Sequence, residues 1–283
     1  MQSAKIPTTI LEQPIQGAFE RDCAAIAARR PVIHAIPVLA TADLVANALH
    51  AVGASPVMTV FSAEIRDIHA RCQAVVLSMG TPDHERFKLL RTAVKSASHY
   101  GLPVVLDPVG VAASTRRLHC ARQVVAAGKR LIIRGNVAEI EALAGVADQN
   151  DVAIDAGRDV EWKPLWENGG GALAVLQAHH AVLATGHIDC LWFGERGHLG
   201  RRGHVYQSKV TGMGCALSAL CAAFFAVNSD QFEAALHALW LSNAAAELAA
   251  SNAKGPGSFA TAWLDALFRL AGNPKEAWPH TRA

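Results

Sequence analysis

The stretch Lys209–Val227 reads KVTGMGCALSALCAAFFAV, and it decides the fold that we predict for the rest of the chain. Its apolar run, Cys215–Val227, is too long and too rich in alanine for a strand, so it predicts a buried helix. Gly212 and Gly214 precede this helix and predict a tight turn with backbone amides at the helix N-terminus. Unpaired amides and the helix dipole make such a turn a site for anions.

Cys215 falls in the first turn of the predicted helix, where the dipole favours a thiolate and predicts a lowered pKa. An anion-binding turn beside an activated thiol indicates catalysis. The motif alone is equally consistent with a structural role, because Gly-x-Gly before a helix is common and a cysteine there is often a small buried side chain. The rest of the chain has to distinguish these two interpretations.

Length and composition predict one large α/β domain over residues 1–283, because 51% of the 283 residues are hydrophobic and 18% are charged. A net charge of +2 gives no indication of a nucleic-acid partner. The six cysteines form no C-x-x-C pair, which favours free thiols in a reducing cytoplasm. The N-terminus has no signal-peptide pattern, and no apolar run is long enough to predict a membrane span.

Strand and helix patterns alternate along the chain and predict a three-layer α/β/α fold with a mostly parallel central sheet. The expected strands are Val32–Ile36, one after the turn Gly53–Met58, Ala74–Ser78, Val104–Asp107, Leu131–Arg134, Ala181–Thr185, and an edge hairpin of Leu191–Phe193 with His204–Gln207 around the turn Gly197–Gly203. The expected helices, besides the central one, are residues 15–30, Ala42–Val52, Asp83–Tyr100, Val137–Ala144 and two within Asp230–Leu270, and Asn168–Gly171 is expected to be a loop.

Four stretches, together with GASPVM at Gly53–Met58, resemble the hydroxyethylthiazole kinases of thiamine salvage, which belong to the ribokinase-like superfamily. They are VVLDPVG (Val104–Gly110), IIRGNVAEIEALAG (Ile132–Gly145), VLATGHID (Val182–Asp189) and VTGMGCALSAL (Val210–Leu220). The resemblance implies a cytoplasmic enzyme that phosphorylates the hydroxyl of 4-methyl-5-(2-hydroxyethyl)thiazole with ATP and Mg²⁺. It also implies a homotrimer with the thiazole bound between subunits.

Three residues carry oxygen atoms suited to magnesium: Asp107, Asn136 and Glu139. Asp107 ends a buried strand, where open α/β sheets bind their ligands. Asn136 and Glu139 are three residues apart at the start of a predicted helix, so both could face the phosphates. The same spacing is typical of a capping box, and the two roles can coexist.

The resemblance assigns ATP and phosphate binding to Arg134, Thr185 and Gly186, together with the glycine turn at Gly212 and Gly214. Arg134 follows a buried strand, from which a guanidinium can reach phosphate oxygens. A structural ion pair is the alternative for Arg134. An ordinary turn at the end of a strand is the alternative for Thr185 and Gly186.

Cys215 matches the catalytic cysteine of the family, with the expected role of accepting or polarising the proton of the substrate hydroxyl. Met58 matches a methionine that contacts the thiazole, and Gly212 is assigned to the substrate as well as to phosphate. Ordinary core packing is the alternative for Met58.

The acceptor side departs from the family pattern. Where the family reads close to H-N-I-T-N, this chain has HAIPV at His34–Val38, so Ala35 and Val38 replace asparagines and Pro37 removes a backbone N–H. Phe61 replaces a polar residue. These changes leave two alternatives open, namely a kinase for another small heterocyclic alcohol and a weakly active, ligand-binding paralogue.

Overall fold

The computed structural model describes residues 7–145, 176 and 179–278. In that part of the chain nine strands form one sheet in the order β1-β9-β8-β7-β6-β5-β4-β2-β3. The pairs β7–β8 and β8–β9 are antiparallel, and all other neighbours are parallel. The strands are β1 Thr9–Leu11, β2 Val32–Ile36, β3 Ser55–Val57, β4 Ala74–Ser78, β5 Val104–Asp107, β6 Leu131–Asn136, β7 Ala181–Thr185, β8 Asp189–Phe193 and β9 Arg196–Gly200.

Helices cover both faces of this sheet, which confirms the predicted three layers. The α-helices are α1 Gln16–Arg29, α2 Ala42–Ala51, α3 Ile65–His69, α4 His84–Tyr100, α5 Thr115–Ala127, α6 Val137–Ala144, α9 Met213–Phe225, α10 Gln231–Asn252 and α11 Pro256–Gly272. Short 3-10 helices are η1 Leu39–Thr41, η2 Ser62–Glu64, η3 Val205–Lys209 and η4 Pro274–Ala277. None of the described helices is both long and apolar enough to cross a membrane.

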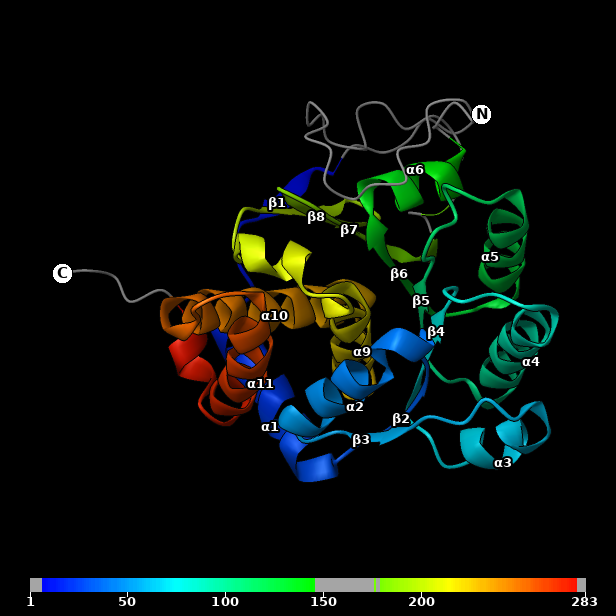
Figure 1. The fold of residues 1–283 in the computed structure, drawn as a ribbon, viewed down its shortest axis with the longest axis horizontal. Helices are drawn as coiled ribbons and strands as arrows, with labels where there is room; N and C mark the ends of the chain where they lie inside the picture. The colour runs from blue at the N-terminus through cyan, green and yellow to red at the C-terminus, as the bar shows by residue number, and fades with distance from the viewer. Residues whose placement is uncertain (1–6, 146–175, 177–178, 279–283) are drawn as a thin grey trace.

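Successive residues of the buried strands enter two separate cores, because neighbouring side chains of a strand point to opposite faces. Val105 joins the core beneath α1, α2, α9, α10 and α11, whereas Val104 and Leu106 join the core beneath α3 to α6. Figure 1 shows α4 and α5 on one side of the sheet and α9, α10 and α11 on the other. Both faces are covered, so the central parallel strands are mostly apolar, and their polar residues, such as Asp107, lie mainly at the carboxyl ends.

The helix α9 is the element predicted from the opening stretch, and it is buried on nearly all sides. It packs against α2, α10, β4 and β5, and side chains such as Leu220 and Phe224 are fully buried. A helix that is apolar all round is stable only in such a core. Its position brings its N-terminus beside Asp107, the last residue of β5.

The predicted edge hairpin is present, and its first strand, Leu191–Phe193, lies within β8, but its second strand overlaps the segment Gly197–Gly203 that was predicted as the turn. Its strands are β8 and β9, joined by a turn with Gly194 at φ +60°. His204–Gln207, predicted as a strand, instead begins η3, so that prediction was wrong. The reason is local: His204 Nδ1 accepts from Tyr206 N, and Gln207 Oε1 accepts from His204 N, which stabilises a helical turn.

Two further differences from the prediction concern β3 and α5. The strand expected after Gly53–Met58 lies inside that segment, as β3. No helix is predicted between the strands at 104–107 and 131–134, yet α5 occupies that segment, with Ser114 Oγ accepting from Arg117 N as its N-cap. The loop predicted at Asn168–Gly171 lies outside the described residues.

Candidate active site

Gly212 and Gly214 form the turn that begins α9, as predicted. Gly212 is the N-cap residue with a φ of +95°, and a Cβ at this position would lie 2.9 Å from Thr41 Cβ. Both the backbone angle and the close approach therefore require glycine. Gly212 provides no side-chain cap, which leaves the first-turn amides of Gly214 and Cys215 open to an external anion.

Arg134 lies over this turn from β6. A Cβ on Gly214 would overlap Arg134 Nη1, so the guanidinium sits directly against the turn. Arg134 Nη2 donates to Thr185 Oγ1, and Nη1 lies 4.0 Å from Asp107 Oδ1. The side chain is 12% exposed. A nearly buried guanidinium beside open helix amides forms a site for phosphate oxygens, and the loose contact with Asp107 does not occupy it fully.

Asp107 is a buried carboxylate at the end of β5. It is 1% exposed, and neither of its oxygens accepts a hydrogen bond of ordinary length and angle from the described residues, although the Cys215 thiol and the Ser78 hydroxyl lie against it. Burial raises the pKa of Asp107 to about 6, and the Arg134 guanidinium offsets only part of that effect. A buried carboxylate with open lone pairs is suited to bind a cation.

The expectation of a lowered pKa at Cys215 was wrong. Burial raises the pKa of the Cys215 thiol well above its usual range, and the negative charge of Asp107 raises it further. The helix dipole acts on the thiol, but desolvation and a nearby carboxylate outweigh it. Thr41 and Arg134 oppose the shift. Cys215 is therefore a protonated thiol while Asp107 carries its charge.

Asn136 and Glu139 form the capping box that the sequence offered as the alternative to a metal site. Glu139 N donates to Asn136 Oδ1 at 2.8 Å, and Asn136 N donates to Glu139 Oε2 at 2.9 Å. The second carboxylate oxygen, Glu139 Oε1, accepts from Gly110 N at 2.9 Å. Glu139 thus ties the loop after β5 to the start of α6, and each oxygen keeps one further lone pair.

The metal set of Asp107, Asn136 and Glu139 fits magnesium through its carboxylates. Mg²⁺ usually takes one or two carboxylates and several waters, and Asp107 provides the open one. Asn136 Oδ1 is already engaged in the helix cap. Among the described residues, no three His, Cys, Asp or Glu side chains are grouped as a metal site by themselves.

Thr185 and Gly186 end β7 and are held in place by a buried polar network. Thr185 Oγ1 donates to Gly135 O at 3.3 Å, and Gly186 N donates to Asp189 Oδ1 at 3.2 Å. Asp189 Oδ2 accepts from Asn243 Nδ2 at 2.9 Å. Burial raises the pKa of Asp189 to about 6. This network fixes the turn beside Arg134, for which the resemblance implies nucleotide binding.

Met58 stands apart from these residues within one chain. It directly follows β3, which is three strands away from β5 in the sheet. At about 4.8 Å per strand, this corresponds to about 14 Å. Met58 is partly buried and packs against the core that contains α9. The sheet therefore separates Met58 from Asp107.

The positions that depart from the family pattern lie in different environments. Ala35 is fully buried within the core, so the lost asparagine there changes packing. Val38 covers Gly80, where a Cβ would overlap Val38 Cγ2. Phe61 is 65% exposed, and Leu39 and Val60 beside these positions are exposed as well. This edge of the molecule therefore presents an apolar surface.

Arg86, a buried cation, was missed by the sequence reasoning. It is 8% exposed, and its Nη2 donates to three main-chain carbonyls at the ends of β2 and β4, those of Ile36 (3.2 Å), Pro37 (2.6 Å) and Ser78 (2.8 Å). Burial lowers its pKa. The available signal was helical spacing, because Arg86 lies four residues before the buried Leu90 on α4.

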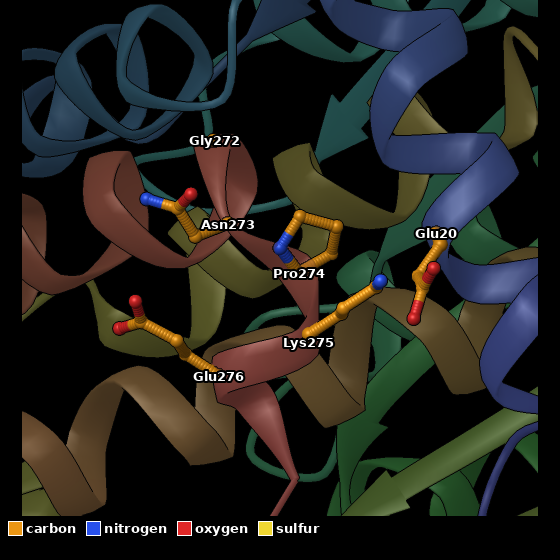
Figure 2. A pocket seen from close by; sticks show the side chains of 6 residues that line it. All are labelled: Glu20, Gly272, Asn273, Pro274, Lys275 and Glu276. Carbon is orange, nitrogen blue, oxygen red and sulfur yellow. The ribbon is translucent and has the colours of Figure 1, made fainter.

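A pocket of about 420 Å³ lies away from the candidate site. Figure 2 shows it between Glu20 of α1 and the segment Gly272–Glu276, with Lys275 extending toward Glu20. It contains none of the residues predicted to bind ATP, metal or acceptor. The candidate site is instead defined by the group of Asp107, Arg134, Cys215 and their neighbours at the ends of β5 to β7.

Comparison with known proteins identifies relatives over most of the chain. The model of the hydroxyethylthiazole kinase family matches residues 23–273. A hydroxyethylthiazole kinase from Nitratidesulfovibrio vulgaris is 36% identical over 252 residues, which cover 89% of this chain and 92% of the relative.

Solved structures give the same result. The structure of a hydroxyethylthiazole kinase protein from Pyrococcus horikoshii is similar with a TM-score of 0.79 and 33% identity, covering 89% of this chain and 93% of that one. A ribokinase-like superfamily protein from Enterococcus faecalis is similar with a TM-score of 0.62 at 11% identity, covering 92% of this chain and 95% of that one. The second likeness shows the shared fold alone.

Proposed function

This chain belongs to the hydroxyethylthiazole kinase family, and from that premise we propose that it transfers the terminal phosphoryl group of ATP to the hydroxyl of 4-methyl-5-(2-hydroxyethyl)thiazole in thiamine salvage. One observation carries the proposal: Arg134 and Asp107 both lie against the open N-terminus of α9, where Cys215 stands. An anion site, a free carboxylate and a proton-carrying group are the parts that phosphoryl transfer requires.

The phosphates of ATP are assigned to the glycine turn and Arg134. The open amides of Gly214 and Cys215 would donate to phosphate oxygens, and the Arg134 guanidinium would neutralise the charge that develops during transfer. Thr185 holds that guanidinium through its hydroxyl, and Gly186 shapes the adjacent turn. Positioning and charge neutralisation account for most of the rate enhancement in this kind of reaction.

Mg²⁺ is assigned to Asp107, with Glu139 as the second carboxylate. Magnesium would supply positive charge that polarises the phosphates. Asp107 is suited to this role because the carboxylate is buried and neither oxygen accepts a hydrogen bond of ordinary length and angle from the described residues. Glu139 holds the loop after β5 through Gly110 N, which fixes the geometry around Asp107. Asn136 contributes mainly as the cap of α6.

Cys215 is assigned to the acceptor hydroxyl. The thiol must lose its own proton before it can accept one from the hydroxyl, and burial together with the ionised Asp107 opposes that loss by raising the Cys215 pKa. Neutralising that charge in the loaded site lowers the barrier to thiolate formation. In a loose transition state the hydroxyl loses its proton late, so we expect a modest contribution, about tenfold to a hundredfold.

The acceptor site is proposed to lie between subunits of a cytoplasmic homotrimer. Met58 follows β3, three strands away from Asp107 on β5, which is consistent with an acceptor site completed by a second copy. The exposed Leu39, Val60 and Phe61 provide apolar surface near this edge. All proposed site residues of one chain come from a single sheet and its helices, consistent with one domain over 1–283.

An ADP-release assay with ATP, MgCl₂ and the thiazole alcohol tests the proposal. Activity should vanish with a chelator, in Asp107→Asn and in Arg134→Met, and Cys215→Ala should lower kcat about tenfold or more. The exposed Asp265→Asn provides the matched control, since this residue lies on α11 away from the site. Wild-type protein that releases no ADP with this acceptor would contradict the assigned substrate.

A second acceptor is favoured by the altered edge of the site. Val38 over Gly80 and the exposed Phe61 make that edge more apolar than the asparagine-containing family pattern. A site with fewer polar groups discriminates less against acceptors that lack a matching polar atom. The same assay, run over apolar-substituted thiazole and pyrimidine alcohols, would rank them above the standard thiazole if this alternative is correct.

A further inference from the structure

A chain of buried hydrogen bonds runs from α4 to the segment that carries Met58. Ser96 Oγ lies 3.0 Å from His69 Nδ1, His69 Nε2 lies 2.9 Å from His34 Nδ1, and His34 Nε2 lies 3.1 Å from Thr59 O. His34 is 0%, His69 1% and Ser96 8% exposed. Three groups from α4, α3 and β2 are thus linked in series, and the last of them, His34, contacts the Thr59 carbonyl.

The direction of every bond in this chain follows from its last acceptor. The Thr59 carbonyl can only accept, so His34 Nε2 must carry a proton. Burial lowers the pKa of His34 and lowers that of His69 to about 4, so both rings are neutral near pH 7. His34 Nδ1 then accepts from His69 Nε2, and His69 Nδ1 accepts from the Ser96 hydroxyl.

The hydrogen bonds of Ser96, His69 and His34 hold the main chain at the point where the sheet ends. The last residue of β3, Val57, is paired with His34 in the ladder of β2 and β3. Beyond Val57 the main chain leaves the sheet, and the His34 ring binds the carbonyl of Thr59 in place of a further rung. Thr59 Oγ1 donates to Glu64 and accepts from Phe61 N at 3.2 Å, so the bend after Met58 depends on Thr59.

We propose that Ser96, His69 and His34 are positioning residues for the acceptor, which hold the Thr59 carbonyl and thereby set the place of Met58. The inference rests on the proposed function, because it takes Met58 as a contact of the acceptor. Ser96 is its sharpest test, since it lies on α4 and contacts the segment only through the two histidines.

Removing the Ser96 hydroxyl should weaken the hold on this segment. In Ser96→Ala, His69 Nδ1 is left as a buried acceptor without its donor, and the His69 ring is no longer fixed from α4. The neutral ring keeps its proton on Nε2 toward His34, so the bonds to His34 and to Thr59 O remain but are held less rigidly.

Hydrogen exchange measures this weakening without any substrate. In Ser96→Ala the amides of residues 58–61 should exchange about three- to tenfold faster, the effect of losing one neutral hydrogen bond. Ser96→Thr keeps a hydroxyl and should restore wild-type exchange. Ser98→Ala is the matched control, because Ser98 Oγ on the same helix donates to Ala127 O at 2.7 Å and takes no part in the chain. Exchange in Ser96→Ala equal to that in Ser98→Ala would overturn the inference.

Steady-state kinetics then tests whether the hydrogen bonds of Ser96, His69 and His34 affect binding of the acceptor. Ser96→Ala should raise the KM of the thiazole alcohol about three- to tenfold with the KM of ATP unchanged, and Ser98→Ala should change neither. Faster hydrogen exchange with an unaltered KM of the acceptor would show that these hydrogen bonds hold the segment but do not position the acceptor. If the wild type phosphorylates no acceptor, the proposed function fails, while the exchange experiment still decides whether the chain holds this segment.

Discussion

Asp107 shows how a single buried residue couples stability to function. Its pKa in the folded protein, about 6, lies above the ordinary value of 3.8. Between these values the folded protein binds a proton that the unfolded chain does not, so stability falls as pH rises through this range and stays low above it. The charge that suits Asp107 to a cation therefore destabilises the metal-free fold.

Asp107→Asn should raise the free energy of unfolding of the metal-free protein at pH 8 by about 1–3 kcal/mol, while it abolishes kinase activity. The gain should shrink at pH 4, where the wild-type carboxyl is protonated. Thermal denaturation in EDTA at both pH values measures it, with the exposed Asp265→Asn as control. An equal or negative effect at both pH values would mean that the buried charge is compensated elsewhere.

Cys215 tests the balance between a helix dipole and burial. Because burial and Asp107 raise its pKa, iodoacetamide should alkylate Cys215 slowly at pH 7–8 in the metal-free protein. Asp107→Asn removes the repelling charge and should accelerate the reaction. Mass spectrometry of the peptide that contains Cys215 follows both rates. Rapid labelling of the wild type would mean that the helix dipole, and not burial, dominates the pKa of Cys215.

At the scale of the element, the start of α9 separates two uses of glycine. Gly212 has a φ of +95° and lies close to the Thr41 side chain, whereas Gly214 is helical and close only to the Arg134 guanidinium. The first glycine is required by the fold and the second by the site. Substituting each with alanine should therefore have different consequences.

Gly212→Ala should lower the free energy of unfolding by about 1–3 kcal/mol, since it adds backbone strain and a contact with Thr41. Gly214→Ala should keep most of the stability, because alanine is a better helix former, but it displaces Arg134 and should raise the KM of ATP. Denaturation and steady-state kinetics of both variants give the comparison. Equal stability losses, with ATP affinity intact in Gly214→Ala, would contradict the assignment.

At the scale of the whole molecule, the exposed apolar edge predicts assembly. Light scattering should give about 90 kDa, three times the chain mass of 30.0 kDa. Phe61→Asp should dissociate the trimer and lower activity, because it places a charge on the apolar surface. Phe268→Asp is the matched control, since Phe268 is 72% exposed on α11. A monomeric wild-type protein in light scattering would contradict an acceptor site that is shared between subunits.

The sequence by itself determined the elements that depend on neighbouring residues. The apolar run after Gly212 and Gly214 became α9, the short apolar runs became the parallel strands, and the Asn136–Glu139 spacing became a capping box. These features follow from backbone geometry and side-chain periodicity within a few residues. Gly212 and Gly214 could be named for phosphate binding for the same reason, whereas Arg134, Thr185 and Gly186 were named from the resemblance to a family.

Only the tertiary structure decided the properties that depend on residues far apart in the chain. The pKa of Cys215 is set by burial and by Asp107, the Arg86 guanidinium joins the ends of β2 and β4, and the bonds of His34 and His69 reach Ser96 and Thr59. The local sequence pattern does not predict these contacts. Desolvation and Coulomb interactions add over every neighbour in space, so their outcome is known only when the chain has folded.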